Sequence, residues 1–318
     1  MTLMLELDFL GKRMKSPFVL ASGVLGTSAS LLARSARAGA GAVTAKSCGP
    51  EPRMGHANPI TIPWKDGFVN AVGLTNPGAE EEVQVLKEAK QRLSKENCLL
   101  FASIFAPTAR EFGRVARIVA EAEPDLIEVN ISCPNVGSEY GTPFSGFPNT
   151  AAEVVRYVRQ ALEGTGVPIS VKLSPNVAEI RSIAKAVVEE GADAITAINT
   201  VPGMLIDAYA GKPILKNKTG GFSGPPIKPI ALRCVYEIAQ TVSVPIIATG
   251  GVASGLDAAE FILAGATLVG VGAGVYLGGA EIFGRLNQEL LAYMAEMNYS
   301  SLGAFRGKAL PGYIVGAG

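Results

Sequence analysis

The sequence predicts an α/β protein built as a (β/α)8 (TIM) barrel with long inserted loops at the carboxyl-end face of the strands. Short apolar runs alternate with amphipathic stretches eight times along the 318 residues, which is typical of parallel strands connected by helices. The runs are almost continuously apolar, as strands covered on both faces require. No internal repeat or linker interrupts the pattern, so we expect a single domain over residues 1–318. A doubly wound sheet is the alternative, but eight regular units favour closure.

The eight expected strands follow one another at regular spacing, and two of the connecting helices carry start signals. Thr150 and Glu153 have the spacing of a capping box, and so do Ser254 and Asp257; each pair precedes apolar residues at helical spacing. We therefore expect a helix to begin at each pair. In chain order, the expected strands are residues 18–21, 42–45, 99–104, 126–131, 169–173, 194–198, 245–248 and 268–271.

Three connections are too long for plain loops: residues 47–76, 133–148 and 201–227. Each follows an expected strand and precedes an expected helix. In a barrel, all three would therefore rise from the carboxyl-end face, where active sites lie. Loops of this length in a compact domain usually serve as lids or binding loops.

Composition excludes several classes of partner. Lys and Arg total 28 against 28 Asp and Glu, so binding to nucleic acid or an anionic membrane by bulk charge is not expected. Four cysteines without CxxC spacing and one histidine indicate a reducing cytoplasm and no metal site in this chain. Acidic residues near the start argue against a signal peptide. Glycines interrupt the uncharged stretch 261–280, so we expect a buried helix end and strand there rather than a membrane span.

Polar residues stand at the ends of the expected strands. The run that begins at Leu126 ends in Asn130, Ser132, Cys133 and Asn135. One reading is a turn beside a buried thiol, and the other is a catalytic cluster. Similar ends recur on the remaining strands, and in a barrel they would meet at one mouth. They are Ser22 and Gly23, Lys46 and Ser47, Ser103, Lys172 and Ser174, Asn199 and Thr200, Gly250 and Gly251, and Gly272 and Ala273.

Such a mouth fits a planar, anionic, amide-rich ligand, because amides supply matched donors and acceptors and lysines supply positive charge. Glycines after the last two strands occupy the phosphate position that is frequent in barrels. Lys172 has two readings: it forms a Schiff base with a carbonyl substrate, or it stabilises negative charge on a cofactor. Lys46 poses the same choice. Cys133 can act as a base, since a free thiol has a pKa of about 8.5.

Three segments, residues 69–78, 130–135 and 216–225, together resemble the catalytic subunit of class 1 dihydroorotate dehydrogenases. The likeness extends from about residue 7 to about residue 283. It implies an FMN enzyme of pyrimidine biosynthesis that oxidises dihydroorotate to orotate. By this resemblance, Cys133 takes the C5 proton while hydride leaves C6 for the flavin.

The resemblance also implies two sets of binding residues. Those that would hold dihydroorotate or orotate are Lys46, Asn70, Ala71, Val72, Gly73, Leu74, Asn130, Asn135, Asn199 and Thr200. Those that would hold FMN are Ser22, Lys46, Ser47, Asn130, Lys172, Ile198, Gly224, Gly250, Gly251, Gly272 and Ala273.

Cysteine at the base position separates the chain from the membrane-bound, quinone-using class, which uses serine. Segments 51–53 and 203–225 resemble the NAD-linked type, which pairs its FMN subunit with a second chain carrying FAD and a [2Fe–2S] cluster. A homodimer core or a heterotetramer is expected by the same likeness. The chain departs from the family at Ser103, where asparagine is common, at Ala273, where threonine is common, and in the loop 137–143. The role of Cys48 and the physiological acceptor stay open.

Two alternatives remain, the first from another resemblance and the second from the residues themselves. A flavoprotein similar to the flavin domain of dihydropyrimidine dehydrogenase would keep the cofactor and act on a pyrimidine base instead. A cofactor-free aldolase or lyase would use Lys172 as a Schiff base.

Overall fold

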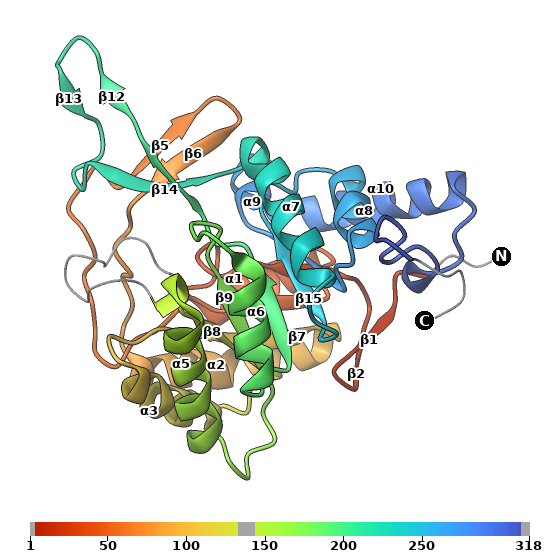
Figure 1. Ribbon diagram of the computed structural model, residues 1–318, viewed down its shortest axis with the longest axis horizontal. Helices are drawn as coiled ribbons and strands as arrows, with labels where there is room; N and C mark the ends of the chain where they lie inside the picture. Colours follow the sequence, from red (N-terminus) through yellow and green to blue (C-terminus); the bar gives the residue numbers. More distant parts are fainter. Residues whose placement is uncertain (1–3, 133–143, 313–318) are drawn as a thin grey trace.

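The computed structural model describes residues 4–132 and 144–312, which form a closed, eight-stranded parallel barrel surrounded by helices (Figure 1). The barrel closes in the order β10-β15-β16-β3-β4-β7-β8-β9. All eight predicted strands are confirmed to within one residue at each end, and the doubly wound alternative is wrong because β10 pairs with β9 as well as β15. The barrel strands are β3 (Phe18–Leu20), β4 (Ala42–Thr44), β7 (Leu99–Ile104), β8 (Leu126–Asn130), β9 (Ile169–Leu173), β10 (Ala194–Ala197), β15 (Ile246–Thr249) and β16 (Leu268–Val271).

Helices connect the strands and cover the outside of the barrel. They are α1 (Ala29–Arg37), α2 (Ala79–Leu93), α3 (Ala109–Ala120), α5 (Pro148–Ala161), α6 (Ile180–Glu189), α7 (Lys228–Ala239), α8 (Gly255–Leu263), α9 (Ala273–Gly278) and α10 (Ile282–Glu296). Short 3-10 helices lie at Ser94–Glu96, Phe144–Gly146, Pro225–Ile227 and Leu302–Ala304. No helix in the described parts of the chain is both long and apolar enough to span a membrane.

The two predicted helix starts have different outcomes. At α8 the Ser254 side chain accepts from the Asp257 backbone N–H and the Asp257 carboxylate accepts from the Ser254 backbone N–H, so this capping box is confirmed. At α5 the prediction is wrong: the helix begins at Pro148, and the Thr150 hydroxyl donates to the carbonyls of Phe144 and Phe147. Proline at the first helical position has a preset φ and no N–H to satisfy, so the helix starts before the Thr150 signal.

Side chains inside the barrel alternate with those that face the helices, as pleated strands require. The part of the interior near the beginnings of the strands is apolar and includes Phe101, Leu126 and Leu268. The hairpin of β1 (Leu7–Phe9) and β2 (Lys12–Met14) closes this end by adding Phe9 and Met14 to the same cluster. One step higher on β8 and β9, the inward positions are polar. The barrel interior is therefore filled with apolar side chains where the strands begin, and polar side chains face inward toward the carboxyl ends of the strands.

Two of the long connections carry strands that the sequence pattern did not reveal. They are β5 (Thr61–Trp64) and β6 (Gly67–Asn70) in the first, and β11 (Val201–Met204) and β14 (Thr219–Ser223) in the third. These strands form an antiparallel sheet in the order β11-β14-β6-β5 on the carboxyl-end side of the barrel (Figure 1). A hairpin of β12 (Ile206–Asp207) and β13 (Lys212–Pro213) projects beyond it. Most of the second connection, residues 133–143, lies outside the described residues.

Candidate active site

A cavity of about 590 Å³ lies between the carboxyl ends of the barrel strands and the antiparallel sheet. Cavities that bind small molecules and cofactors typically measure about 300–1,000 Å³, so this one has the size of a cofactor or substrate site. Every barrel strand except β7 contributes a described lining residue, directly or through the loop that follows it. The sheet contributes Asn70 from β6 and Ser223 from β14.

The cavity brings together most of the residues singled out from the sequence. Ala71 is an exception: its side chain is fully buried against Val69 and Leu215, because its neighbours on the chain face the cavity instead. Cys133 and Asn135 lie outside the described residues. The predicted residues that line the cavity are Ser22, Lys46, Ser47, Asn70, Val72, Gly73, Leu74, Asn130, Lys172, Ile198, Asn199, Thr200, Gly224, Gly250, Gly251, Gly272 and Ala273.

Two amides at the cavity wall, Asn130 at the end of β8 and Asn199 just after β10, are held together by hydrogen bonds. Asn130 Oδ1 accepts hydrogen bonds from the Ser132 backbone N–H at 3.3 Å and the Ser132 hydroxyl at 3.1 Å. Asn199 Nδ2 lies 2.9 Å from Ser132 Oγ and 3.5 Å from Asn130 Oδ1, and Asn199 Oδ1 accepts from Thr200 N–H at 2.8 Å. The orientations of both amides are therefore set before any ligand binds, which lowers the entropic cost of recognition.

Lys172 forms a buried ion pair at the floor of the cavity. Its Nζ lies 2.9 Å from Ser22 Oγ and 3.5 Å from Glu128 Oε1, and both charged side chains are less than a tenth exposed. The sequence reading missed Glu128, although it stands inside an otherwise apolar strand two residues before Asn130 and so faces the same side. That spacing is the signal that would have found it.

A second buried carboxyl belongs to Glu82, in the first turn of α2. It lies near enough to Lys46 for the two charges to interact. Burial raises its pKa to about 7, and the positive charge of Lys46 opposes the rise. Glu82 Oε1 has no hydrogen-bond partner among the described residues. Burial also raises the pKa of the Cys48 thiol far above its usual range, and the charge of Glu82 adds to this effect. Cys48 is therefore a protonated, fully buried side chain, which makes it a structural residue rather than a reactive one.

Glycines open the other end of the cavity to backbone contacts. A Cβ atom placed on Gly272 would meet only Ala21 Cβ at 3.6 Å, and one on Gly23 would meet nothing within 4 Å. Gly250 and Gly251 have positive φ angles of 139° and 85°, which glycine adopts without strain. This open glycine backbone, two lysines and fixed amides fit a planar cofactor that carries a phosphate.

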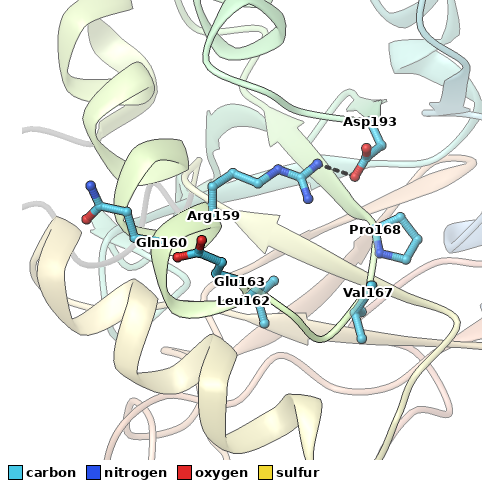
Figure 2. Close-up of a pocket in the computed structure, with 8 residues that line it drawn as sticks. Arg159, Gln160, Leu162, Glu163, Val167, Pro168 and Asp193 are labelled. Atoms are coloured by element: carbon cyan, nitrogen blue, oxygen red, sulfur yellow. Dashed lines mark hydrogen bonds and ion pairs between the residues drawn. The ribbon is translucent and has the colours of Figure 1, made fainter.

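Another cavity, of about 480 Å³, lies where β9 and β10 begin, at the opposite end of the barrel (Figure 2). Two of its charged groups, Arg159 and Asp193, already contact other groups of the chain. The Arg159 guanidinium contacts the Asp193 carboxylate and the Gly191 carbonyl, and Asp193 Oδ2 also accepts from the Ile169 N–H at 2.7 Å. This arrangement ties α5 to the start of two strands and leaves the mouth cavity as the candidate active site.

The fold and the cavity define a (β/α)8-barrel enzyme with a site of cofactor or substrate size at the carboxyl ends of its strands. The family model described as dihydroorotate dehydrogenase matches residues 4–294. The chain belongs to the dihydroorotate dehydrogenase family.

Three relatives are named dihydroorotate dehydrogenase B (NAD(+)), catalytic subunit. The chain is 42% identical to the one from Methanocaldococcus jannaschii over 93% of this chain and 95% of the relative. It is 41% identical to the one from Pyrococcus abyssi over 96% and 99%, respectively. It is 42% identical to the one from Methanosarcina mazei over 94% and 93%.

Proposed function

We propose that this chain is the catalytic subunit of an NAD-linked dihydroorotate dehydrogenase, which oxidises dihydroorotate to orotate in pyrimidine biosynthesis. The observation that carries the proposal is the cavity at the carboxyl ends of the strands, which combines two lysines, fixed amides and an open glycine backbone. Family membership and relatives that share this name support it.

Oxidation of dihydroorotate removes a proton from C5 and a hydride from C6, leaving a double bond between them. Cys133 is the proposed base for the C5 proton, since a thiolate can accept it at neutral pH once its surroundings favour ionisation. Lys46 would pair with the substrate carboxylate. Asn70, Asn130 and Asn199 line the cavity and would exchange hydrogen bonds with the ring amides.

FMN is the proposed cofactor, and when bound it would supply the acceptor for the hydride. Lys172 would lie near the part of the ring that gathers negative charge, while Gly250, Gly251 and Gly272 would offer backbone donors to the phosphate. Of the two single-residue departures noted above, Ala273 lines the cavity and Ser103 does not. Neither change removes a lysine or a glycine backbone from the proposed site.

Electrons must then leave the site for NAD, and we propose that a partner subunit carrying FAD and a [2Fe–2S] cluster conveys them. The phrase "catalytic subunit" in the names of the relatives supports a second subunit. Within the described residues, no group of His, Cys, Asp and Glu could hold a metal ion, so a cluster would need ligands from elsewhere.

The geometry disfavours the Schiff-base alternative. A Schiff-base lysine attacks as a free amine, whereas Lys172 is engaged by both Glu128 and Ser22. The dihydropyrimidine alternative predicts a different specificity, because a pyrimidine base carries no carboxylate for Lys46.

Anaerobic titration of the purified protein tests the proposal. We expect a bound flavin that is released as FMN on denaturation and is bleached by dihydroorotate but not by dihydrouracil. Lys46→Met should weaken orotate binding more than uracil binding. Bleaching by dihydrouracil alone would favour the pyrimidine-base enzyme, and a colourless protein that takes up no FMN would overturn the flavin assignment. Co-purification of the native protein with a second, iron-containing chain tests the partner.

A further inference from the structure

Beneath the floor of the cavity, inward side chains from three barrel strands meet around one carboxylate. Glu128 on β8 is 4% exposed and Ser103 on β7 is 1% exposed. Neither lines the cavity, whereas Lys172 on β9 does. The carboxylate therefore lies one layer below the lysine that faces the ligand.

Glu128 Oε1 accepts hydrogen bonds from three side chains. Ser22 Oγ lies 2.8 Å away, Ser103 Oγ 3.0 Å and Lys172 Nζ 3.5 Å. Ser22 also accepts from Lys172 Nζ at 2.9 Å, so lysine, serine and glutamate form a closed triangle.

The network extends sideways through hydroxyl groups. Ser103 Oγ lies 2.8 Å from Ser47 Oγ, and Ser47 lines the cavity. A serine at position 103 thus turns away from the cavity and connects the buried carboxylate to a second wall residue. Both cavity serines, Ser22 and Ser47, are held by this arrangement.

A buried carboxylate is costly unless charge and hydrogen bonds compensate it. Here three donors converge on one oxygen, and the only cation among them is also the group aimed at the ligand. The negative charge of Glu128 consequently opposes the positive charge that Lys172 presents to the cavity. Lys172 lines the cavity and Glu128 does not, so the lysine would lie closer to a bound flavin and its effect would be the larger of the two.

We propose that Glu128 is a positioning residue that fixes the Lys172 ammonium at the cavity floor and sets how strongly that charge favours the reduced flavin. This inference rests on the proposed flavin function. By this inference Glu128 influences the reduction potential of the bound flavin, in addition to linking the barrel strands.

The charges predict an order of reduction potentials. Removing the carboxylate with Glu128→Gln leaves the lysine charge unopposed and raises the potential. Removing the ammonium with Lys172→Met leaves the carboxylate and lowers it. The double variant has neither charge, so its potential falls between that of Lys172→Met and that of the wild type.

The experiment measures the FMN midpoint potential of the purified proteins against a reference dye, together with FMN affinity by fluorescence quenching. Ser103→Ala is the matched control, since it removes one hydrogen bond from Glu128 and leaves both charges. We expect Glu128→Gln to favour reduced over oxidised FMN about tenfold more than the wild type, which is about 30 mV for a two-electron couple. Ser103→Ala should shift the potential by less than half as much.

The outcomes separate this inference from the proposed function. A wild-type protein that takes up no FMN overturns both. A flavin-loaded wild type whose potential is unchanged or lowered by Glu128→Gln overturns the inference alone. If Glu128→Gln does not fold, the double variant decides, because replacing both members of a buried pair is tolerated better than breaking it. A double variant whose potential equals that of Lys172→Met also overturns the inference.

Discussion

Replacing Glu82 with glutamine removes the buried carboxyl beside Lys46 while keeping its size. Glu82 is 2% exposed on the first turns of α2, and its Oε1 atom has no partner among the described residues. Burial, opposed by the charge of Lys46, raises the pKa of this group from 4.5 to about 7. The folded protein therefore holds the proton more tightly than the unfolded chain.

The sign of the pH effect follows from this difference. A group whose pKa is raised on folding contributes its full stability below the unfolded pKa and loses it as pH rises through the folded pKa. A pKa raised from 4.5 to about 7 corresponds to about 3 kcal/mol, at 1.36 kcal/mol per pH unit. Wild-type protein should lose most of this between pH 5 and pH 8. Glutamine does not ionise and loses none of it.

Urea unfolding followed by far-ultraviolet circular dichroism at several pH values measures the effect. The free energy of unfolding of Glu82→Gln minus that of the wild type should grow by about 2–3 kcal/mol from pH 5 to pH 8. Glu81→Gln is the matched control, because Glu81 is in the same turn and exposed, and the change with pH should be larger for Glu82→Gln than for this variant. A constant difference for Glu82→Gln would refute the reasoning, since it would mean that Glu82 titrates alike in the folded and unfolded states.

Three further changes test the site and the barrel. Cys133→Ala should leave FMN bound and slow flavin reduction by dihydroorotate about 10²–10⁴-fold, which stopped-flow absorbance measures; unchanged rates would exclude Cys133 as the base. Gly250→Ala places a Cβ 2.6 Å from Ala231 Cβ at a φ of +139°, so FMN affinity measured by fluorescence should fall about tenfold or more; an unaltered affinity would show that this turn does not shape the cofactor site. Phe9→Ala empties part of the closed end of the barrel, where Phe9 packs 5.9 Å from Phe101 between ring centroids. It should cost about 3–5 kcal/mol of unfolding free energy with orotate affinity unchanged, and a weakened orotate affinity would show that the two ends are coupled.

The barrel was predictable from the sequence because each of its strands has a local sequence pattern. A short, continuously apolar run followed by a helical pattern is visible within a few residues, and polar strand ends such as Lys46 and Asn199 follow directly. Glu128 was not predicted as a site residue because it lies within the apolar run 126–131. Lys172 also lies within an apolar run, residues 169–173, and there the charged residue was predicted to belong to the site.

The antiparallel sheet was not predictable in this way because its pairing is non-local. Strand β6 pairs with β14 through Asn70 and Gly221, which lie far apart in the chain, and Pro63 and Pro202 interrupt the pattern of β5 and β11. The start of α5 was misjudged for a different reason, since the fixed φ of Pro148 outweighed the signal at Thr150.

The antiparallel sheet also constrains how such an enzyme can change during evolution. Its strands come from two insertions, residues 61–70 and 201–223, which join across the β6–β14 pair. One insertion cannot be exchanged for that of a distant homologue without leaving its partner strand mismatched at Asn70 and Gly221. The barrel residues that would hold the cofactor lie outside both insertions. A change in the sheet that covers the cavity would therefore have to involve both insertions together, because each supplies one strand of the β6–β14 pair.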